Sequence, residues 1–318
     1  MKLAIATQRK GKSALTGEVL SEAMPWIKEI TGKTVVIKYG GAALVDSELR
    51  RSVLSDILML KMLGVKPVIV HGGGSAMNDQ LRKRNFPVEF IDGQRVTHEE
   101  SLDFVREVMT GEINQQLVWE MNQHGNIAVG ISGIDGGVIV AEPGDPRLKK
   151  TGRITRINEG LISGLVEDNY IPVVAAIAIG EDNGVFNVNA SLAAGHIASA
   201  IGAHKLVFIS DVDGLYKNKD NSDSRIANMN KQEAINLLAD KCNTTGGSIP
   251  KLQSCIHALD KGVYSVHVLN GKIPHVMLVE FLTDEGIGTS ISNLGDPETG
   301  GRALVNDFAS RLIENRCR

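Results

Sequence analysis

Residues 34–41 of this 318-residue chain read TVVIKYGG, and residues 67–74 read PVIVHGGG. Each stretch begins with a short run rich in β-branched residues, Thr34–Ile37 and Pro67–Val70, and ends in consecutive glycines. Continuous apolar runs of this kind are typical of strands that are buried on both faces of a parallel sheet. The two stretches therefore predict neighbouring buried strands that each lead into a tight glycine turn.

The rest of the chain continues this alternation of short apolar runs and longer helix-like segments. Further runs of the strand type are Asn126–Ile131, Ile171–Ile177, Leu206–Ser210 and Ser265–Leu269. Segments with helical periodicity are Asp46–Leu63, Ala76–Arg84, His98–Gln123, Glu159–Asn169, Leu192–Gly202 and Lys231–Asp240. Such alternation predicts an α/β fold with a mainly parallel sheet and helices on both faces. Ligands of these sheets collect at the carboxyl ends of strands, where the glycine turns should lie.

Composition and charge narrow the classes of partner. The formal net charge is -3, with both signs spread along the chain, so we expect neither nucleic acid nor a membrane surface as a partner. No apolar run reaches the roughly 18 to 20 residues that span a bilayer, and residues 1–13 lack a secretory apolar core. Cys242, Cys255 and Cys317 form no paired motif, which favours a reducing, cytoplasmic setting.

Three glycine clusters give the first indication of chemistry. Besides Gly40–Gly41 and Gly72–Gly74, residues 245–251 read TGGSIPK, and we expect this cluster also to follow a strand. Glycine lets backbone N–H groups approach an anion, and a helix that begins after the turn adds the positive end of its dipole. Any one cluster is equally well explained as a tight turn. Three clusters, two of them with a lysine, favour phosphate binding.

Six short motifs occur in an order that is similar to that of a known family. They are VIKYGG (36–41), VHGGG (70–74), RVT (95–97), NVNA (187–190), SDVDGL (210–215) and GGSIPK (246–251). Over about residues 32–291 the chain resembles the amino-acid kinase family, and within it the branch that phosphorylates N-acetyl-L-glutamate in arginine biosynthesis. The resemblance implies a three-layer α/β/α sandwich with a mainly parallel sheet, the carbamate-kinase-like fold, in two lobes.

The resemblance also implies a division of the chain. Residues 33–186 would form an N-lobe that binds the acyl acceptor, and residues 187–291 a C-lobe that binds ATP and an effector. Residues 1–32 carry an apolar helical stripe, which either packs on the chain's own core or makes an oligomer contact, and Pro25 should kink this helix. Residues 292–318 would form a tail helix.

The implied activity is transfer of a phosphoryl group from ATP, with Mg²⁺, to the carboxylate of N-acetyl-L-glutamate. Lys38 and Lys251 would be catalytic and would contact the migrating group from opposite lobes. The nucleotide would be bound by Gly40, Gly41, Asp211 and Lys251, and the acceptor by Gly72, Gly73, Arg95, Asn187 and Asn189. No metal cage of protein residues is visible in the sequence, so Mg²⁺ would be held by the ATP phosphates.

Simpler roles compete with these assignments. The lysines and Arg95 could be solvated surface charges, and Asn187 and Asn189 could serve turns or helix caps. Ser191 stands where the family usually has an aspartate between the two lysines, and we expect it to cap the following helix. Without that carboxylate, two ammonium groups about 4 Å apart repel by roughly 1 to 4 kcal/mol. The alternatives are a catalytically impaired sensor or regulatory paralogue, and a sister kinase for another amino-acid carboxylate.

Two further segments resemble the arginine-inhibited members of the family, in which an extra N-terminal helix joins dimers into a hexamer. Residues 15–30 resemble that helix, and residues 280–289 resemble the arginine-binding end. The implied effector residues are Lys205, Glu280, Glu285 and Gly288. We therefore expect a homo-oligomer, either a dimer or a hexamer, with arginine as its feedback inhibitor.

Overall fold

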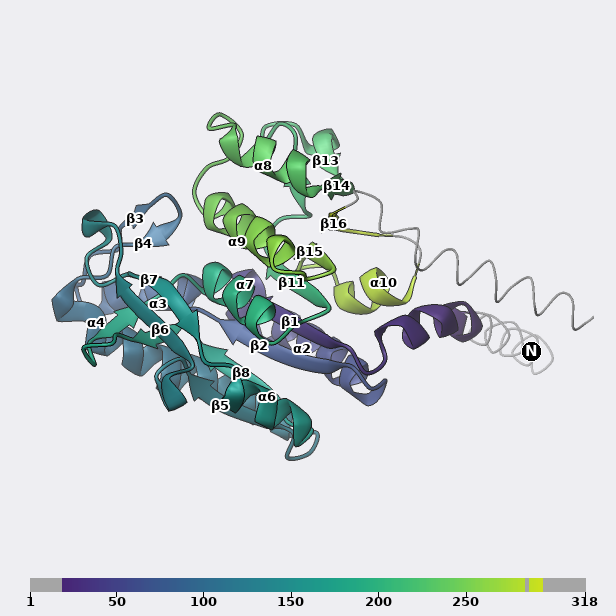
Figure 1. Ribbon diagram of the computed structural model, residues 1–318, viewed down its shortest axis with the longest axis horizontal. Coiled ribbons are helices and arrows are strands. Elements are labelled where there is room, and N and C mark those ends of the chain that lie inside the picture. The colour runs from purple at the N-terminus through teal and green to yellow at the C-terminus, as the bar shows by residue number, and fades with distance from the viewer. Residues whose placement is uncertain (1–18, 284–285, 294–318) are drawn as a thin grey trace, which may run out of the picture.

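The computed structural model describes residues 19–283 and 286–293. Its framework is an eight-stranded sheet with the order β14-β16-β15-β11-β1-β2-β8-β5 (Figure 1). Neighbouring strands run parallel except for the pair β15 and β16. The strands of this sheet are β1 (Thr34–Tyr39), β2 (Lys66–His71), β5 (Ala128–Ser132), β8 (Ile171–Ala175), β11 (Lys205–Ser210), β14 (Asn228–Asn230), β15 (Ser265–Asn270) and β16 (Thr289–Ser292).

Helices cover both faces of the sheet, which gives three layers (Figure 1). From β1 the chain continues to β2, on one side of β1 in the sheet. After β8, on that same side, it crosses β1 to reach β11 on the other side. Because crossover connections between parallel strands are right-handed, helices in connections that run in opposite directions along the sheet lie on opposite faces of it. The helices are α2 (Ser47–Met62), α3 (Gly74–Lys83), α4 (Glu99–Glu107), α5 (Gln115–Asn122), α6 (Gly160–Glu167), α7 (Ala190–Ala200), α8 (Lys231–Ala239), α9 (Ser248–Asp260) and α10 (Val276–Leu282).

Three smaller sheets lie beside the framework. A four-stranded sheet has the order β10-β9-β6-β7, and two hairpins pair β3 with β4 and β12 with β13. Their strands are β3 (Phe90–Ile91), β4 (Gln94–Arg95), β6 (Ile139–Pro143), β7 (Gly152–Ile157), β9 (Ile177–Ile179), β10 (Val185–Asn187), β12 (Leu215–Tyr216) and β13 (Arg225–Ile226).

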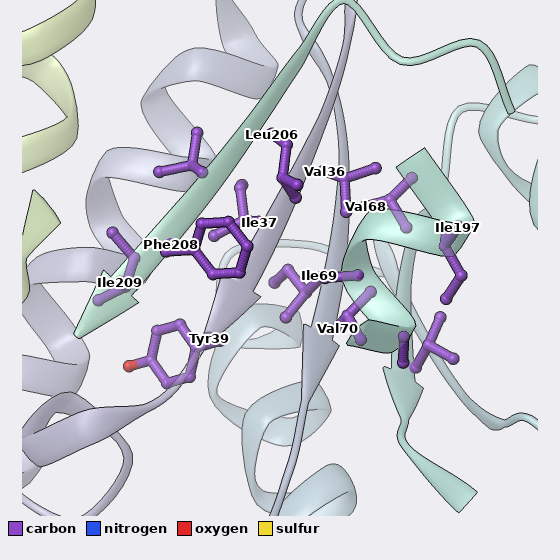
Figure 2. Packing of buried hydrophobic residues seen from close by; sticks show 14 of the residues in the cluster. Val36, Ile37, Tyr39, Val68, Ile69, Val70, Ile197, Leu206, Phe208 and Ile209 are labelled. Atoms are coloured by element: carbon purple, nitrogen blue, oxygen red, sulfur yellow. The ribbon is translucent and has the colours of Figure 1, made fainter. Parts of the chain in front are cut away.

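The hydrophobic core lies over the central strands β1, β2 and β11, as Figure 2 shows. Its side chains include Val36, Ile37, Val68, Ile69, Val70, Leu206, Phe208 and, from α7, Ile197. Tyr39 is also fully buried, and its hydroxyl donates to O of Ala43 at 2.8 Å. That bond satisfies the buried phenol and fixes the short 3₁₀ helix Gly41–Leu44 that follows the first glycine turn.

The structure confirms the α/β class, the mainly parallel sheet and the two buried strands that were expected at Thr34–Ile37 and Pro67–Val70. The expected helix at His98–Gln123 consists of α4, a π-helical turn at Val108–Asn114, and α5. The expectation for the third glycine cluster is wrong: the cluster at 245–251 does not follow a strand, because it connects α8 to α9. Residues 19–30 are helical, whereas residues 1–18 and the tail 294–318 lie outside the described residues. The division into two lobes stays a prediction.

Candidate active site

The carboxyl ends of β1, β2 and β11 lie side by side and open on a cavity of about 480 Å³. This is the point where the strand connections change direction, the usual position of a ligand in such sheets. The predicted site residues that line the cavity are Lys38, Gly41, Gly72, Gly73, Arg95, Asn187, Asn189, Asp211 and Lys251. Gly40 lies directly behind Lys38, since a Cβ at this glycine would collide with Nζ of Lys38.

Asp211, which directly follows the neighbouring strand β11, holds the first glycine turn in place. Its Oδ1 accepts a hydrogen bond from N of Ala42 at 2.5 Å. Gly41 has a φ of +72°, and a Cβ there would lie 2.7 Å from the same carboxylate oxygen. Only glycine combines this left-handed conformation with so close an approach. Asp211 therefore fixes the turn that was predicted to bind the nucleotide.

Two lysines reach the cavity from elements far apart in the sequence. Lys38 lies in β1, and Lys251 lies in the first turn of α9. Burial and then the charge of Lys251 lower the pKa of Lys38 to about 8, and Asp211 acts in the opposite direction. Burial also lowers the pKa of Lys251, while Cys255 and Asp211 counteract it. An anion between these ammonium groups would stabilise both charges.

Two helices begin at the cavity with no side-chain cap. Gly73 precedes α3 and Gly247 precedes α9, and neither helix receives a side-chain hydrogen bond at its N-cap. The N–H groups of a first helical turn have no partner within the helix, and they carry the positive end of the helix dipole. Both helix ends are thus suited to receive the anionic groups of a ligand.

Arg95 provides a further cationic group, on the β3–β4 hairpin. Its Nη2 donates to Oδ1 of Asn78 at 2.5 Å, and its guanidinium carbon lies 4.8 Å from the ring centroid of Phe90. Its Nη1 is buried and has no hydrogen-bond partner among the described residues. Burial lowers the pKa of Arg95 to about 10. A buried donor without a partner is costly, and a ligand carboxylate would supply that partner.

The two asparagines have different hydrogen-bonding roles. Asn187 is buried, and its Nδ2 donates to Oγ1 of Thr97 at 2.9 Å. Asn189 is the N-cap of α7, since its Oδ1 accepts from N of Ser191 at 2.9 Å. The structure thus gives Asn189 the helix-cap role that competed with ligand binding, although the residue also lines the cavity.

Ser191 is not the helix cap that the sequence suggested. It is the second residue of α7, buried at the wall of the cavity, and its carbonyl accepts from Oγ of Ser254 at 2.6 Å. Asp211 is the only acidic residue in the described lining of the cavity. The two lysines therefore share one carboxylate.

Three of the four implied effector residues line a second cavity, of about 230 Å³, at the other end of the sheet. Lys205, Glu280 and Gly288 line it, together with Trp26, Glu29 and Ile30 of the N-terminal helix; Glu285 lies outside the described residues. Nζ of Lys205 lies 3.5 Å from Oε1 of Glu29.

His267 also lines this second cavity, and no motif pointed to it, because it lies within the buried strand β15. Its Nδ1 lies 2.7 Å from Oε1 of Glu280. Burial alone would raise the pKa of Glu280, but the hydrogen bond and charge of His267 lower it overall. The cavity thus combines an ionised carboxylate with the ammonium group of Lys205.

The active-site cavity also contains residues that the sequence did not single out, chiefly Asn78, Phe90, Gly93 and Thr151. In the described part of the chain, no three His, Cys, Asp or Glu side chains are grouped as a metal site. No helix among the described residues has the length and apolar character to cross a membrane.

Comparison with known proteins agrees with this geometry. The sequence profile described as the amino acid kinase family matches residues 33–270. The chain belongs to the amino acid kinase family. Acetylglutamate kinase of Caldanaerobacter subterraneus subsp. tengcongensis is 42% identical to it over 291 residues, which cover 90% of this chain and 96% of that protein.

Solved structures place this amino acid kinase in the same fold. N-acetylglutamate synthase of Neisseria gonorrhoeae, in complex with coenzyme A and N-acetyl-glutamate, has a TM-score of 0.75 and 25% identity. The alignment covers 86% of this chain but only 63% of that synthase, so the chain spans less than two thirds of its length. Carbamate kinase of Giardia lamblia bound to citric acid has a TM-score of 0.61 and 16% identity over 82% of this chain and 98% of that one. The carbamate-kinase-like fold is thereby confirmed.

Proposed function

We propose that this amino acid kinase phosphorylates N-acetyl-L-glutamate with ATP and forms N-acetyl-L-glutamyl 5-phosphate in arginine biosynthesis. One observation carries the proposal: Lys38 and Lys251 converge on one cavity with glycine turns and a buried nitrogen of Arg95 that has no partner within residues 19–283 and 286–293. The acetylglutamate kinase that is 42% identical over nearly its whole length supports the choice of acceptor.

The proposed mechanism is an in-line displacement at phosphorus. The acceptor's side-chain carboxylate attacks the γ-phosphorus, the bond to the bridging oxygen of ADP breaks, and the negative charge moves onto ADP. Because the nucleophile is already an anion, no side chain has to remove a proton. Lys38 and Lys251 stabilise the charge on the migrating group, while Arg95 holds the acceptor's α-carboxylate.

Magnesium fits this cavity only as a companion of ATP. Asp211 is the one carboxylate in the described lining, which is too few for a protein cage. Mg²⁺ bound by the ATP phosphates, with Asp211 nearby, would neutralise part of their charge.

Hydroxamate detection of acyl phosphate, with ATP, Mg²⁺ and N-acetyl-L-glutamate, tests the proposal. We expect turnover by the wild type and its loss in Lys38→Met and Lys251→Met. Faster turnover of N-acetyl-aminoadipate than of N-acetyl-L-glutamate would instead identify a sister kinase. Binding of both substrates without any acyl phosphate would identify the sensor, which Ser191 makes the second candidate function.

Regulation and location extend the proposal. Arginine would bind in the second cavity, where Lys205 can receive its carboxylate and Glu280 its guanidinium. The exposed side chains of Val19, Leu20 and Met24 on the N-terminal helix support a further oligomer contact, in a hexamer. The free thiols of Cys242 and Cys255 support a cytoplasmic location.

A further inference from the structure

Residues 148–151 join the two parts of the proposed acceptor site. On one side, N of Lys150 donates to O of Thr97 at 2.9 Å; on the other, N of Asn187 donates to O of Lys150 at 3.0 Å. Thr151 forms a bridge with Asn187 and lines the active-site cavity. This segment therefore lies between the strand end that carries Arg95 and the strand end that carries Asn187.

A chain of side-chain hydrogen bonds crosses the same junction. Nδ2 of Asn187 donates to Oγ1 of Thr97 at 2.9 Å, and Oγ1 of Thr97 lies 2.8 Å from Oγ1 of Thr151. Oγ1 of Thr151 then donates to O of Arg95 at 2.6 Å. Thr97 and Thr151 are 0% and 1% exposed, so each hydroxyl depends on these neighbours for its hydrogen bonds.

The direction of each of these hydrogen bonds follows from the final acceptor, the carbonyl oxygen of Arg95. The carbonyl of Arg95 can only accept, so the single hydroxyl proton of Thr151 is committed to it. Thr97 must then donate to Thr151, which leaves Thr97 only lone pairs for Asn187. The amide of Asn187 must accordingly turn its nitrogen toward Thr97, because a flipped amide would set two oxygens together without a proton.

We infer that Thr97 and Thr151 are positioning residues that hold the backbone of Arg95 and the amide of Asn187 in one orientation toward the acyl acceptor. The inference rests on the proposed function, in which Arg95 and Asn187 bind that acceptor. The groups proposed to bind ATP lie directly after β1, directly after β11 and in α9, outside this chain of hydrogen bonds. Loss of a hydroxyl should therefore weaken use of the acceptor more than use of ATP.

Steady-state kinetics of Thr151→Val and Thr151→Ser test this assignment. Valine keeps the shape of threonine and removes the hydroxyl, so kcat/KM for N-acetyl-L-glutamate should fall about 5- to 100-fold, with KM for ATP changed less than about twofold. Serine keeps the hydroxyl and should restore most of the loss. Thr155→Val is the control, because it removes a threonine hydroxyl from the same strand region away from this cavity. Thr155 lies in β7, and its Oγ1 donates to O of Val140 at 3.2 Å.

A double variant distinguishes a connected chain of hydrogen bonds from two independent hydrogen bonds. Thr97→Val combined with Thr151→Val should be little worse than either single change, because breaking one link already disrupts the chain. Melting temperature and ATP binding check that each variant is folded, and Thr97→Val replaces Thr151→Val if the latter is not. The inference is overturned if the valine variant uses the acceptor as the wild type does, if serine restores nothing, or if the use of ATP declines equally.

Failure of the proposed function is a separate result. If the wild type produces no acyl phosphate, calorimetric titration with N-acetyl-L-glutamate still compares the variants. Weaker binding by Thr151→Val than by Thr151→Ser would then support the positioning role without the kinase activity. Equal affinities, or no binding by the wild type, would overturn it.

Discussion

The side chain of Lys38 lies over Gly40 at the carboxyl end of β1, where burial and Lys251 lower its pKa to about 8. The charged form is the one that stabilises a phosphate, and raising the pH through this pKa removes it. In the free enzyme, kcat/KM for ATP should therefore be constant below about pH 8 and fall about tenfold per pH unit above it.

The pH profile of Lys38→Arg provides the control for this prediction. Arginine stays protonated throughout the range, so the decline near pH 8 should vanish even though the maximal rate is lower. A decline that persists unchanged in Lys38→Arg would assign it to another group.

Ser191 leaves the two lysines with Asp211 as their shared carboxylate. A carboxylate at position 191 would reduce their repulsion, which is worth roughly 1 to 4 kcal/mol at about 4 Å. We expect Ser191→Asp to raise kcat about tenfold or more and to move the alkaline decline to higher pH. Ser191→Asn is the matched neutral control, and equal rates for the two variants in the hydroxamate assay would contradict the prediction.

At the scale of elements, the strands and turns of the site could be predicted because their signals are local. An apolar run that ends in glycines defines β1 and β2 by itself. The glycine cluster at 245–251 follows the mainly polar residues 240–244 and connects α8 to α9, so the expectation that it follows a strand was wrong. The sequence analysis did not include α9 among the expected helices; Pro250 lies in its first turn, where proline is tolerated.

The positioning residues could not be predicted, because their partners lie far away in the chain. Thr151 contacts residues that are 54 and 56 positions away, and Asn187 donates to a residue 90 positions away. No periodicity or motif in a single sequence records such contacts. The sequence thus indicated which side chains could bind a ligand, and the fold was needed to show what orients them.

The tip of the β3–β4 hairpin lines the cavity and lies against the turn that precedes α9. Gly93 has a φ of +76°, and a Cβ there would collide with the backbone of Gly246, before α9. Gly93→Ala should therefore push the hairpin that carries Arg95 away from α9 and raise KM for the acceptor about tenfold.

Gly202→Ala separates this steric effect from backbone strain. Gly202 has a φ of +60°, but a Cβ there would meet no heavy atom within 4 Å. Both variants should lose about 1 to 2 kcal/mol of stability from the left-handed conformation, measured by denaturant unfolding. Only Gly93→Ala should also change KM, and an equal change in both variants would exclude the closed hairpin as its cause.

Across the molecule as a unit, the N-terminal helix both lines the second cavity and carries exposed apolar side chains. Its buried side packs Ala23 and Ile30 against the fold, while Val19, Leu20 and Met24 are 52%, 58% and 56% exposed. The burial of one side supports packing on the chain's own core, whereas an oligomer contact through the exposed side stays a prediction.

Removal of residues 1–31 should have two effects. The particle should become smaller by light scattering after gel filtration, since the exposed side chains are lost. Arginine inhibition should also weaken, because Trp26, Glu29 and Ile30 line the cavity in which arginine is proposed to bind.

The double variant Leu20→Ser/Met24→Ser separates these effects, because it alters the exposed side only. It should dissociate the assembly but retain a cavity that binds arginine in calorimetry. If the truncated protein elutes as the full chain does, the helix has no role in assembly; if it is inhibited by arginine as strongly, the helix has no part in the effector site.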